Sequence, residues 1–235
     1  MDIRFSRAEL IYGEALDIIR TKRVAVFGLG GVGSYVVEAL ARSGMGALDI
    51  IDSDIVDITN INRQLYALTS TVGKNKTEVA KERILDINPG CKVTAHTLFY
   101  NAETADSIPM SEYDYVVDAI DSVTSKLLLI ERAMAAGVKI ICSMGTGNKT
   151  DPSCLEIADI SETSVCPLAR VMRYELRKRG IRKGLTVCYS KEEPVKRPAP
   201  ESGENKRPVP GSTAFVPPSA GMLIASRVVN ELVFG

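Results

Sequence analysis

The chain has 235 residues, of which 45% are apolar and 25% are charged. These proportions are those of a globular protein, and the length suits one large α/β domain or two small ones. Lysine plus arginine equals aspartate plus glutamate, at 29 each, so the average surface gives no reason to expect a nucleic acid or an anionic membrane as a partner. Any site for a polyanion must therefore be a local patch.

The sequence shows no pattern of a signal peptide, of a membrane-spanning segment or of a disulfide framework. The N-terminus has no apolar stretch of signal-peptide length, and no later stretch is both long enough and free enough of charge to span a bilayer. The five cysteines are odd in number and widely spaced, which favours reduced thiols over a disulfide framework. We therefore expect a cytoplasmic protein without a membrane partner.

The first half of the chain alternates between predicted strands and predicted helices. Apolar residues at helical spacing over 6–20 predict one or two short helices broken near Gly13. A β-branched run over 24–27 then leads through glycines into a helical pattern over 32–43. Such alternation implies a doubly wound, mainly parallel, Rossmann-like α/β sheet with helices on both faces. The other predicted elements of this half are strands over 48–52, 91–97, 113–117 and 138–142, and helices over 76–85 and 123–136.

The second half is less regular. A helix is predicted over 167–178 between short strands over 155–158 and 185–189, and the chain ends in an apolar helical segment over 220–233. Seven of the eleven prolines fall in the stretch of about 191–218. Since proline removes a hydrogen-bond donor and fixes φ, we expect a long loop there.

A glycine-rich turn follows the first predicted strand. Residues 28–33 read Gly-Leu-Gly-Gly-Val-Gly and open a helix, which is the context that a phosphate-binding turn requires. Glycines let the backbone approach a phosphate, and the helix N-terminus offers free N–H groups. Asp52, at the end of the second strand, suits ribose hydroxyls. These features indicate an adenine nucleotide, and an NAD-dependent oxidoreductase would show them too.

The segment after the second strand favours a triphosphate. Its roughly three to four negative charges need cations, and a bidentate arginine plus a lysine suit phosphate oxygens. A solvated charged loop is the alternative, although the stretch over 60–64 is sparse in acids. The residues concerned are Asp54, Asn60, Asn62, Arg63, Gln64, Lys74 and Lys76.

Two carboxylates, Asp118 and Asp121, follow the fourth predicted strand. Ligands of doubly wound sheets bind outside the carboxyl ends of strands, so one of the two could hold Mg²⁺ on the phosphates. Capping of the next helix by Asp121 or Ser122 is the alternative.

These motifs, in this order and spacing, resemble the MoeB/ThiF-type branch of the ubiquitin-activating-enzyme superfamily. The resemblance implies an enzyme that uses ATP to transfer AMP to a carboxylate, with Arg63 and Lys76 on the phosphates and Asp121 on Mg²⁺. On this interpretation residues 1–235 form a single adenylating domain, with N-terminal helices over 1–22, an ATP-binding core over 23–150 and a substrate-side extension over 151–235. The implied nucleotide-binding residues are Gly28, Gly30, Gly31, Gly33, Asp52, Asp54, Asn60, Asn62, Arg63, Gln64, Lys76, Asp118 and Asp121.

The N-terminus is similar to an arginine element of the same superfamily. Arg4-Phe-Ser-Arg7 resembles its Arg-Tyr-x-Arg sequence. There the second arginine reaches the γ-phosphate of the partner subunit. The resemblance therefore implies a homodimer in which Arg7 is catalytic in trans.

Superfamily members that adenylate ubiquitin-like sulfur carriers usually hold zinc with two Cys-x-x-Cys pairs, and this chain has no such pair, so no zinc is expected. Stretches such as 39–44, 151–152 and 211–221 look more like the tRNA threonylcarbamoyladenosine dehydratase group. That resemblance implies adenylation of the threonyl carboxylate of the modified adenosine beside the anticodon. The ring then closes as AMP leaves, with net loss of water.

A tRNA substrate predicts a local basic patch. The run over 170–183 carries seven cations opposed by Glu175 alone, although a solvated helix face is the alternative. Lys196, Lys206 and Arg207 would extend it. The predicted tRNA-binding residues are Arg170, Arg173, Arg177, Lys178, Arg179, Arg182 and Lys183.

Other functions stay open at this point. The strongest alternative is an adenylyltransferase for the C-terminal glycine of a ubiquitin-like sulfur carrier; a NAD-dependent oxidoreductase and a non-catalytic nucleotide-sensing or tRNA-binding module follow. A sulfur-relay protein partner is also open. So is a phosphate role for Lys74, although spacing favours Lys76.

Overall fold

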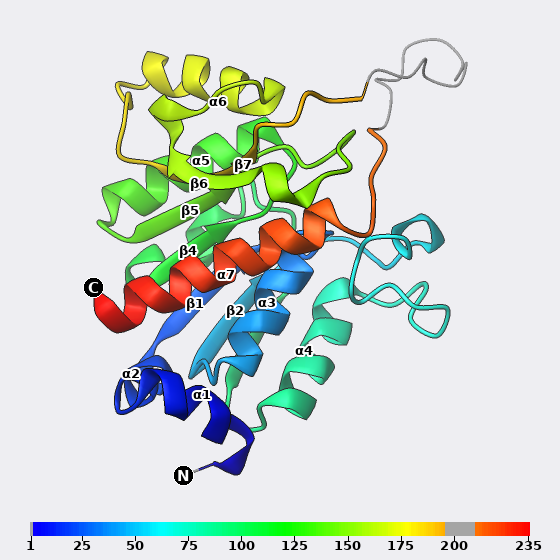
Figure 1. Ribbon diagram of the computed structural model, residues 1–235, viewed down its shortest axis with the longest axis vertical. Coiled ribbons are helices and arrows are strands. Elements are labelled where there is room, and N and C mark those ends of the chain that lie inside the picture. The colour runs from blue at the N-terminus through cyan, green and yellow to red at the C-terminus, as the bar shows by residue number, and fades with distance from the viewer. Residues whose placement is uncertain (1, 196–209) are drawn as a thin grey trace.

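The structure is a computed structural model that describes residues 2–195 and 210–235. Its strands form one sheet of seven, in the order β3-β2-β1-β4-β5-β7-β6. All neighbouring strands run parallel except β6, which runs antiparallel to β7. The predicted doubly wound, mainly parallel sheet is confirmed (Figure 1). The strands are β1 (Arg23–Phe27), β2 (Ala47–Ile51), β3 (Lys92–His96), β4 (Tyr115–Asp118), β5 (Lys139–Ser143), β6 (Leu155–Asp159) and β7 (Thr186–Ser190).

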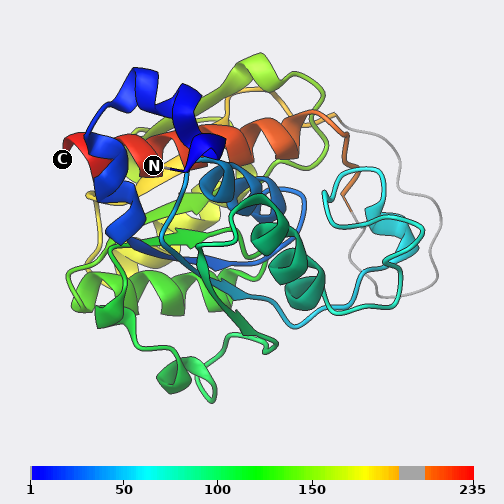
Figure 2. The ribbon, with the colours of Figure 1, turned by 90° about the horizontal axis from the view of Figure 1, so that it is seen from below.

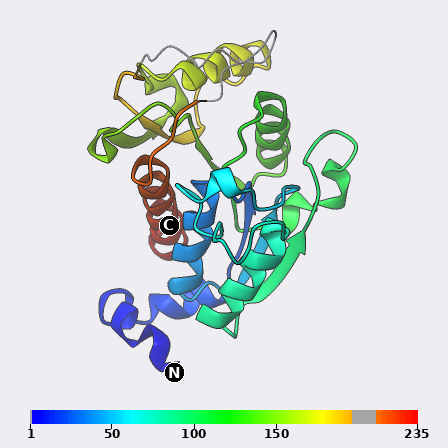
Figure 3. The same cartoon turned by 90° about the vertical axis from the view of Figure 1, so that its right-hand side faces the viewer.

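Helices cover both faces of this sheet. Figure 3 shows α3, α4 and α7 on one side, and α5 with α6 on the other. From β1 the chain moves outward to β2 and β3 and then returns to β4 on the opposite side of β1. The order of the strands therefore reverses between β1 and β4, and the carboxyl ends of these two strands mark the usual ligand crevice. The helices are α1 (Ser6–Tyr12), α2 (Ala15–Thr21), α3 (Gly33–Arg42), α4 (Lys76–Ile87), α5 (Val123–Ala135), α6 (Pro167–Lys178) and α7 (Val216–Phe234).

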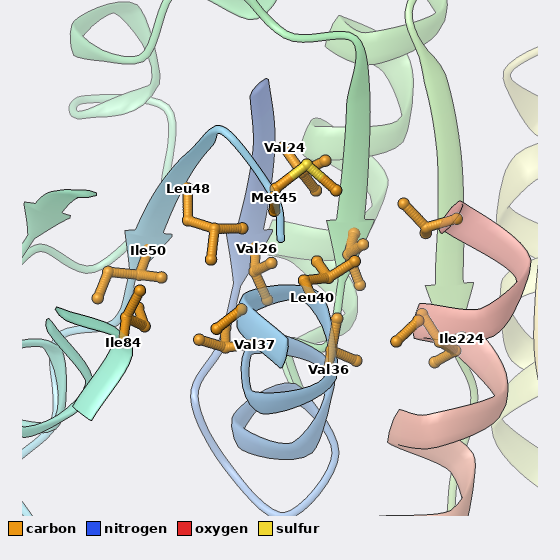
Figure 4. Packing of buried hydrophobic residues seen from close by; sticks show 14 of the residues in the cluster. Val24, Val26, Val36, Val37, Leu40, Met45, Leu48, Ile50, Ile84 and Ile224 are labelled. Atoms are coloured by element: carbon orange, nitrogen blue, oxygen red, sulfur yellow. The ribbon is translucent and has the colours of Figure 1, made fainter. Parts of the chain in front are cut away.

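Alternation along β1 builds a separate core on each face of the sheet. Val24 and Val26 face α3 and α7, whereas Ala25 and Phe27 face α5 and α6. Side chains of a strand point alternately to opposite faces, so a strand buried on both sides reads as a continuous apolar run. Figure 4 shows the first core, where Leu40 of α3 and Ile224 of α7 pack against the sheet.

Both ends of the chain pack on the rest of the molecule. The N-terminal helices break at Gly13, which has a φ of 55°, as the sequence predicts. Figure 2 shows α1 and α2 beside the C-terminal end of α7, where the Tyr12 and Phe234 rings lie 6.2 Å apart. No helix of the described residues is long and apolar enough to cross a membrane.

The predicted proline-rich loop over 191–218 ends earlier than expected. Helix α7 begins at Val216, so Pro217 and Pro218 lie in its first turn. The first turn of a helix has N–H groups without partners, and proline is therefore tolerated there. Residues 196–209 of the predicted loop, which include Lys196, Lys206 and Arg207, lie outside the described residues.

Gly221 sets the distance between α7 and α3. A Cβ atom at this position would lie 2.6 Å from the Val32 carbonyl oxygen and 2.8 Å from Tyr35 Cβ.

Gly→Ala inside a helix normally stabilises by about 0.5–1 kcal/mol. Here we expect Gly221→Ala to lower the free energy of unfolding by about 1–3 kcal/mol, because the added methyl overpacks the contact. Denaturant titration measures this change in the free energy of unfolding. Ser226→Ala, an exposed substitution on the same helix, is the control. Stabilisation by Gly221→Ala would contradict this packing.

Candidate nucleotide site

A cavity of about 920 Å³ opens at the carboxyl ends of β1 and β4. It is lined by the glycine turn, by the end of β2 and the residues after it (Ile51–Ile55), by Ala119–Asp121 after β4 and by parts of the crossover that leads to Lys76. These segments lie far apart in the sequence and converge because the strand order reverses here. In Figure 3 the cyan crossover after β2 lies in front of this edge of the sheet.

The glycine turn closes because two of its residues lack a side chain. Gly28 has a φ of 87°, and a Cβ atom on it would lie 2.6 Å from the Ala119 carbonyl oxygen. A Cβ atom on Gly33 would overlap the carbonyl oxygen of Gly28. Gly28, Gly30 and Gly31 line the cavity, whereas Gly33 lies behind them at the start of α3. The turn thus brings backbone and the N-terminus of α3 to the place where a phosphate would bind.

Asp52 is fixed by backbone donors. Its carboxylate accepts hydrogen bonds from the Leu29 N–H at 2.6 Å and from the Asp54 N–H at 2.8 Å. Burial raises the pKa of the Asp52 carboxyl above its usual value, and the opposing effects of the Lys76 charge and of the two N–H groups are smaller. The geometry suits an acceptor for ribose hydroxyls at the end of β2.

Lys76 lies at the first position of α4 and is 4% exposed. Its Nζ lies 2.7 Å from Asp54 Oδ2 and 4.0 Å from Asp52 Oδ1. The ammonium therefore lies in the cavity beside both carboxylates. Lys74 is exposed and does not line the cavity, so of the two lysines only Lys76 lies in the cavity.

Arg63 lies beside the glycine turn. A Cβ atom on Gly31 would be 3.4 Å from Arg63 Cγ. One guanidinium nitrogen, Nη1, donates to the Thr59 carbonyl oxygen at 2.9 Å and to Asn62 Oδ1 at 3.0 Å. No carboxylate of the described residues forms an ion pair with Arg63, so the rest of the guanidinium is available for an anion.

The three predicted amides have different positions. Asn60 and Gln64 are buried and line the cavity, and the Gln64 Nε2 atom faces Gly30. Asn62 is exposed, does not line the cavity, and donates instead to the Ser212 carbonyl oxygen at 3.0 Å. Its side chain therefore holds the crossover against the segment that precedes α7.

The two carboxylates after β4 also have different positions. Asp118 is completely buried behind the cavity, where Oδ2 lies 3.0 Å from Lys126 Nζ. It is not among the lining residues, so the expected direct contact of Asp118 with the nucleotide is not what the geometry shows. Asp121 is exposed and lines the cavity, while Ser122 caps α5. Capping is therefore done by Ser122, which leaves Asp121 to face a ligand.

Arg7 lies far from this cavity in the same chain. It is exposed on α1, and α2 ends just before the amino end of β1, at the edge of the sheet opposite to the cavity. The Arg7 side chain therefore does not contribute to the cavity of its own chain.

The predicted basic residues after Pro167 differ in how free their charges are. Glu175 pairs with Lys178 at 2.9 Å and with Arg179 at 3.1 Å, and Arg179 also pairs with Glu131. Arg173 donates to the Thr163 carbonyl oxygen at 2.8 Å. No ion pair to a described residue involves Arg170, Arg177, Arg182 or Lys183.

Sequence patterns miss two walls of the cavity. Leu98, Phe99 and Tyr100 follow β3 and lie on the side of Asp52, where an apolar wall suits an adenine ring. The stretch 143–147, Ser-Met-Gly-Thr-Gly, begins at the last residue of β5 and lines the opposite side. A glycine pair just past a strand of a doubly wound sheet is the signal that would have indicated the second wall. The first wall carries no such signal.

The comparison with protein families agrees with this geometry. A model described as the ThiF family matches residues 5–233. This chain belongs to the ThiF family. A tRNA threonylcarbamoyladenosine dehydratase of Bacillus subtilis is 45% identical over 240 residues, which cover 98% of this chain and 94% of that relative.

Solved structures of a relative from E. coli are similar over nearly the whole length of the chain. The tRNA N6-threonylcarbamoyladenosine dehydratase of that organism in complex with ATP superposes with a TM-score of 0.86 at 34% identity, covering 97% of this chain and 93% of that one. Its complex with AMP gives a TM-score of 0.87 at the same identity and coverage.

The raised pKa of Asp52 predicts how ATP binding depends on pH. At neutral pH, Asp52→Ala should weaken ATP binding about tenfold or more, because hydrogen bonds to an ionised group contribute about 1.5–3 kcal/mol. As pH falls through the pKa of Asp52, the wild type loses the ionised acceptor. The dissociation constant of ATP for Asp52→Ala, divided by that for the wild type, should therefore fall toward one. Because this pKa is raised, the fall should begin above the usual range of an aspartate. Calorimetric titration with ATP across pH measures the ratio.

The ratio cancels the protonation of ATP itself, which affects both proteins alike. Glu78→Ala, which removes an exposed carboxylate of α4, is the matched control and should bind ATP as the wild type does. A ratio for Asp52→Ala that stays constant with pH would contradict a role for the ionised carboxylate.

Proposed function

We propose that this chain catalyses the ATP-dependent dehydration of N6-threonylcarbamoyladenosine beside the tRNA anticodon, through adenylation of its carboxylate. The observation that carries this proposal is the cavity itself. It brings a glycine turn, Asp52, Arg63 and Lys76 together at the strand reversal. Relatives that bear this dehydratase name match nearly the full length of the chain, and the relative from E. coli binds ATP and AMP in the same fold.

The proposed reaction has two steps. A carboxylate oxygen of the threonyl group attacks the α-phosphorus of ATP, so that a C–O–P bond forms and pyrophosphate leaves. The carbamoyl group of the same substrate then attacks the activated carbonyl, and AMP leaves with the oxygen that the substrate loses. Attack within one molecule needs orientation rather than a protein nucleophile. Four of the five cysteines are buried, and burial raises the pKa of the Cys188 thiol to about 12, which agrees with a reaction that uses no thiolate.

Charge in the cavity explains why further cations would be needed. Arg63 and Lys76 are the two cations among the lining residues, against the four carboxylates Asp52, Asp54, Asp57 and Asp121, so the lining carries more negative than positive charge. ATP adds about four negative charges. Such an excess is a barrier unless other cations enter with the nucleotide or reach the site from elsewhere.

Asp121 fits one such cation, Mg²⁺. The described residues contain no group of three or more His, Cys, Asp or Glu side chains that could hold a metal ion alone. Mg²⁺ is normally bound through one or two carboxylates, phosphate oxygens and waters, so a single exposed carboxylate on the cavity suffices. When bound, Mg²⁺ would neutralise charge on the phosphates and on leaving pyrophosphate.

Arg7 of a second copy would supply the other cation. Its own cavity is out of reach, and the same N-terminal segment exposes Ile3, Leu10 and Ile11, which are 84%, 87% and 79% exposed. Large apolar side chains grouped on one exposed segment are typical of an interface. The proposed homodimer would bury them and place Arg7 at the partner's nucleotide.

The proposed tRNA substrate would bind where α6 and the loop after it carry cations without ion pairs. It also implies a cytoplasmic protein, because the reaction takes place on tRNA. Binding that rests on phosphate contacts should weaken steeply with salt.

Arg63→Ala should lower the rate of pyrophosphate release by about 10²–10³-fold, as expected for loss of one group that stabilises charge in the transition state. The assay combines Mg-ATP with tRNA that carries threonylcarbamoyladenosine, and follows pyrophosphate together with the mass of the nucleoside. Lys81→Ala, an exposed cation of α4, is the control and should behave as the wild type. Wild-type protein that forms neither AMP nor a nucleoside lighter by one water would overturn the proposed function.

The trans role of Arg7 predicts complementation between two inactive variants. Arg7→Ala and Arg63→Ala should each be inactive alone. After the two proteins are mixed and allowed to exchange subunits, up to about a quarter of the wild-type rate should return, because half of the dimers are mixed and each has one intact site. Sedimentation checks that dimers form. A mixture of exchanged dimers that stays inactive would contradict the trans arrangement.

A further inference from the structure

A second cavity, of about 710 Å³, lies at the start of α6. Its walls come from Val165–Pro167, from the α6 residues Arg170 and Arg173, from Asn148 and from Glu193–Val195. It carries two guanidinium groups against the one carboxylate of Glu193, so its local charge is positive. Nothing in the adenylation chemistry requires this space.

The second cavity adjoins the nucleotide cavity at two places in the chain. Residues 145–147 line the nucleotide cavity and the next residue, Asn148, lines the second one. In the same way Leu168 lines the nucleotide cavity, whereas Pro167 lines the second. One residue spans at most about 3.8 Å between Cα atoms, so the second cavity begins almost where the first ends.

Asn148 holds this boundary in place. It has a φ of 57° and accepts from the Val195 N–H at 2.7 Å, while its side-chain oxygen accepts from the Gly211 N–H at 2.6 Å. Val195 belongs to the second cavity and Gly211 to the first. A single residue therefore ties together the walls that separate the two spaces.

Val165 adds a sign that this wall is specialised. It has a φ of 56°, in the left-handed region, and is 42% exposed. A β-branched side chain rarely adopts that conformation, and such residues cluster at binding sites. This strained residue lies two positions before α6, the helix that carries Arg170 and Arg173.

We propose that the second cavity binds the backbone phosphate next to the reacting adenosine of the tRNA, with Arg170 as the residue that contacts it. The proposal rests on the proposed function. When the carboxylate of the modified base reaches the nucleotide cavity, the phosphates of the same nucleotide must lie within one nucleotide of it, and this is the adjoining positive space. Arg173 is partly occupied by Thr163 and would orient the cavity wall, whereas Arg170 is exposed and forms no ion pair with a described residue.

The test uses the full chain and a synthetic anticodon stem-loop RNA that carries threonylcarbamoyladenosine. Arg170→Gln should raise the KM for this RNA about tenfold and reduce the slope of log KM against log salt by about 0.7–1, as expected for one lost phosphate contact. The KM for ATP and kcat at saturating RNA should stay as in the wild type. Lys139→Gln, which removes an exposed cation at the amino end of β5, should change none of these.

A second RNA identifies the group that Arg170 contacts. A neutral methylphosphonate replaces, in separate RNAs, the phosphate on the 5′ or the 3′ side of the modified nucleotide. For one of these RNAs, binding to the wild type should be about tenfold weaker than binding of the unmodified-backbone RNA. The Arg170→Gln variant should bind the same two RNAs equally well, because the substitution and the methylphosphonate remove the same contact. If, for both RNAs, the loss of affinity from the methylphosphonate multiplies with the loss from Arg170→Gln, the two changes act on different contacts and the proposal is overturned.

Two other outcomes are distinguishable. If Arg170→Gln leaves the KM for RNA unchanged while Arg63→Ala still abolishes dehydration, the cavity does not bind this phosphate and the proposed function stands. If wild-type protein does not dehydrate the RNA, the proposed function fails and the proposal fails with it.

Discussion

The nucleotide cavity depends on one steric constraint, the contact between the glycine turn and the end of β4. Gly28 can lie against the Ala119 carbonyl only because it has no Cβ atom, and Gly33 fits against Gly28 for the same reason. This contact fixes where α3 begins. Asp52 then accepts its hydrogen bond from Leu29 of the turn, so the position of this carboxylate, which we propose as the ribose acceptor, follows from the same contact.

Helix α7 extends this close packing to the other side of the turn. A Cβ atom on Gly31 would lie 3.0 Å from Pro217 Cβ, and Gly221, one turn further along α7, approaches Val32. The C-terminal helix therefore packs against the glycine turn, while the segment just before this helix contributes Pro210–Ser212 to the cavity wall. Residues almost two hundred positions after the turn in the sequence hold its shape.

Ion pairs between residues of the chain lie inside the cavity. Lys76 is bound to Asp54, whose side chain is 64% exposed. Asp54 therefore has room to turn toward solvent, and in the proposed reaction a phosphate would take its place beside Lys76. Asp52, in contrast, is buried with two backbone donors and a raised pKa, so it carries a desolvation cost that hydrogen bonds from a ligand would offset.

Much of the fold could be predicted from the sequence, because buried parallel strands read as short apolar runs and the glycine turn has a strict context. The sequence could not show which charged side chains pair with each other and which face the cavity. Asp118 and Asp121 look equivalent in the sequence, yet one is completely buried with Lys126 and the other faces the cavity. Only the packing of α5 on β4 decides this. The apolar wall of Leu98 and Phe99 was missed for a similar reason, since an apolar run after a strand carries no mark of its ligand.

The basic run of α6 shows how a chain of zero net charge can present a positive patch. Charge counting in the sequence treats its cations as one group. In the structure, Glu175 and Glu131 pair with Lys178 and Arg179 at the C-terminal end of the helix, so these charges largely cancel. The first two turns carry Arg170 and Arg173 with no such partner among the described residues. Among the described residues, cations without an ion pair therefore remain at both ends of α6: Arg170 and Arg173 beside the nucleotide cavity, and Arg177, Arg182 and Lys183 at and after the last turn. Their positive charge is a local feature that the zero net charge of the chain does not reveal.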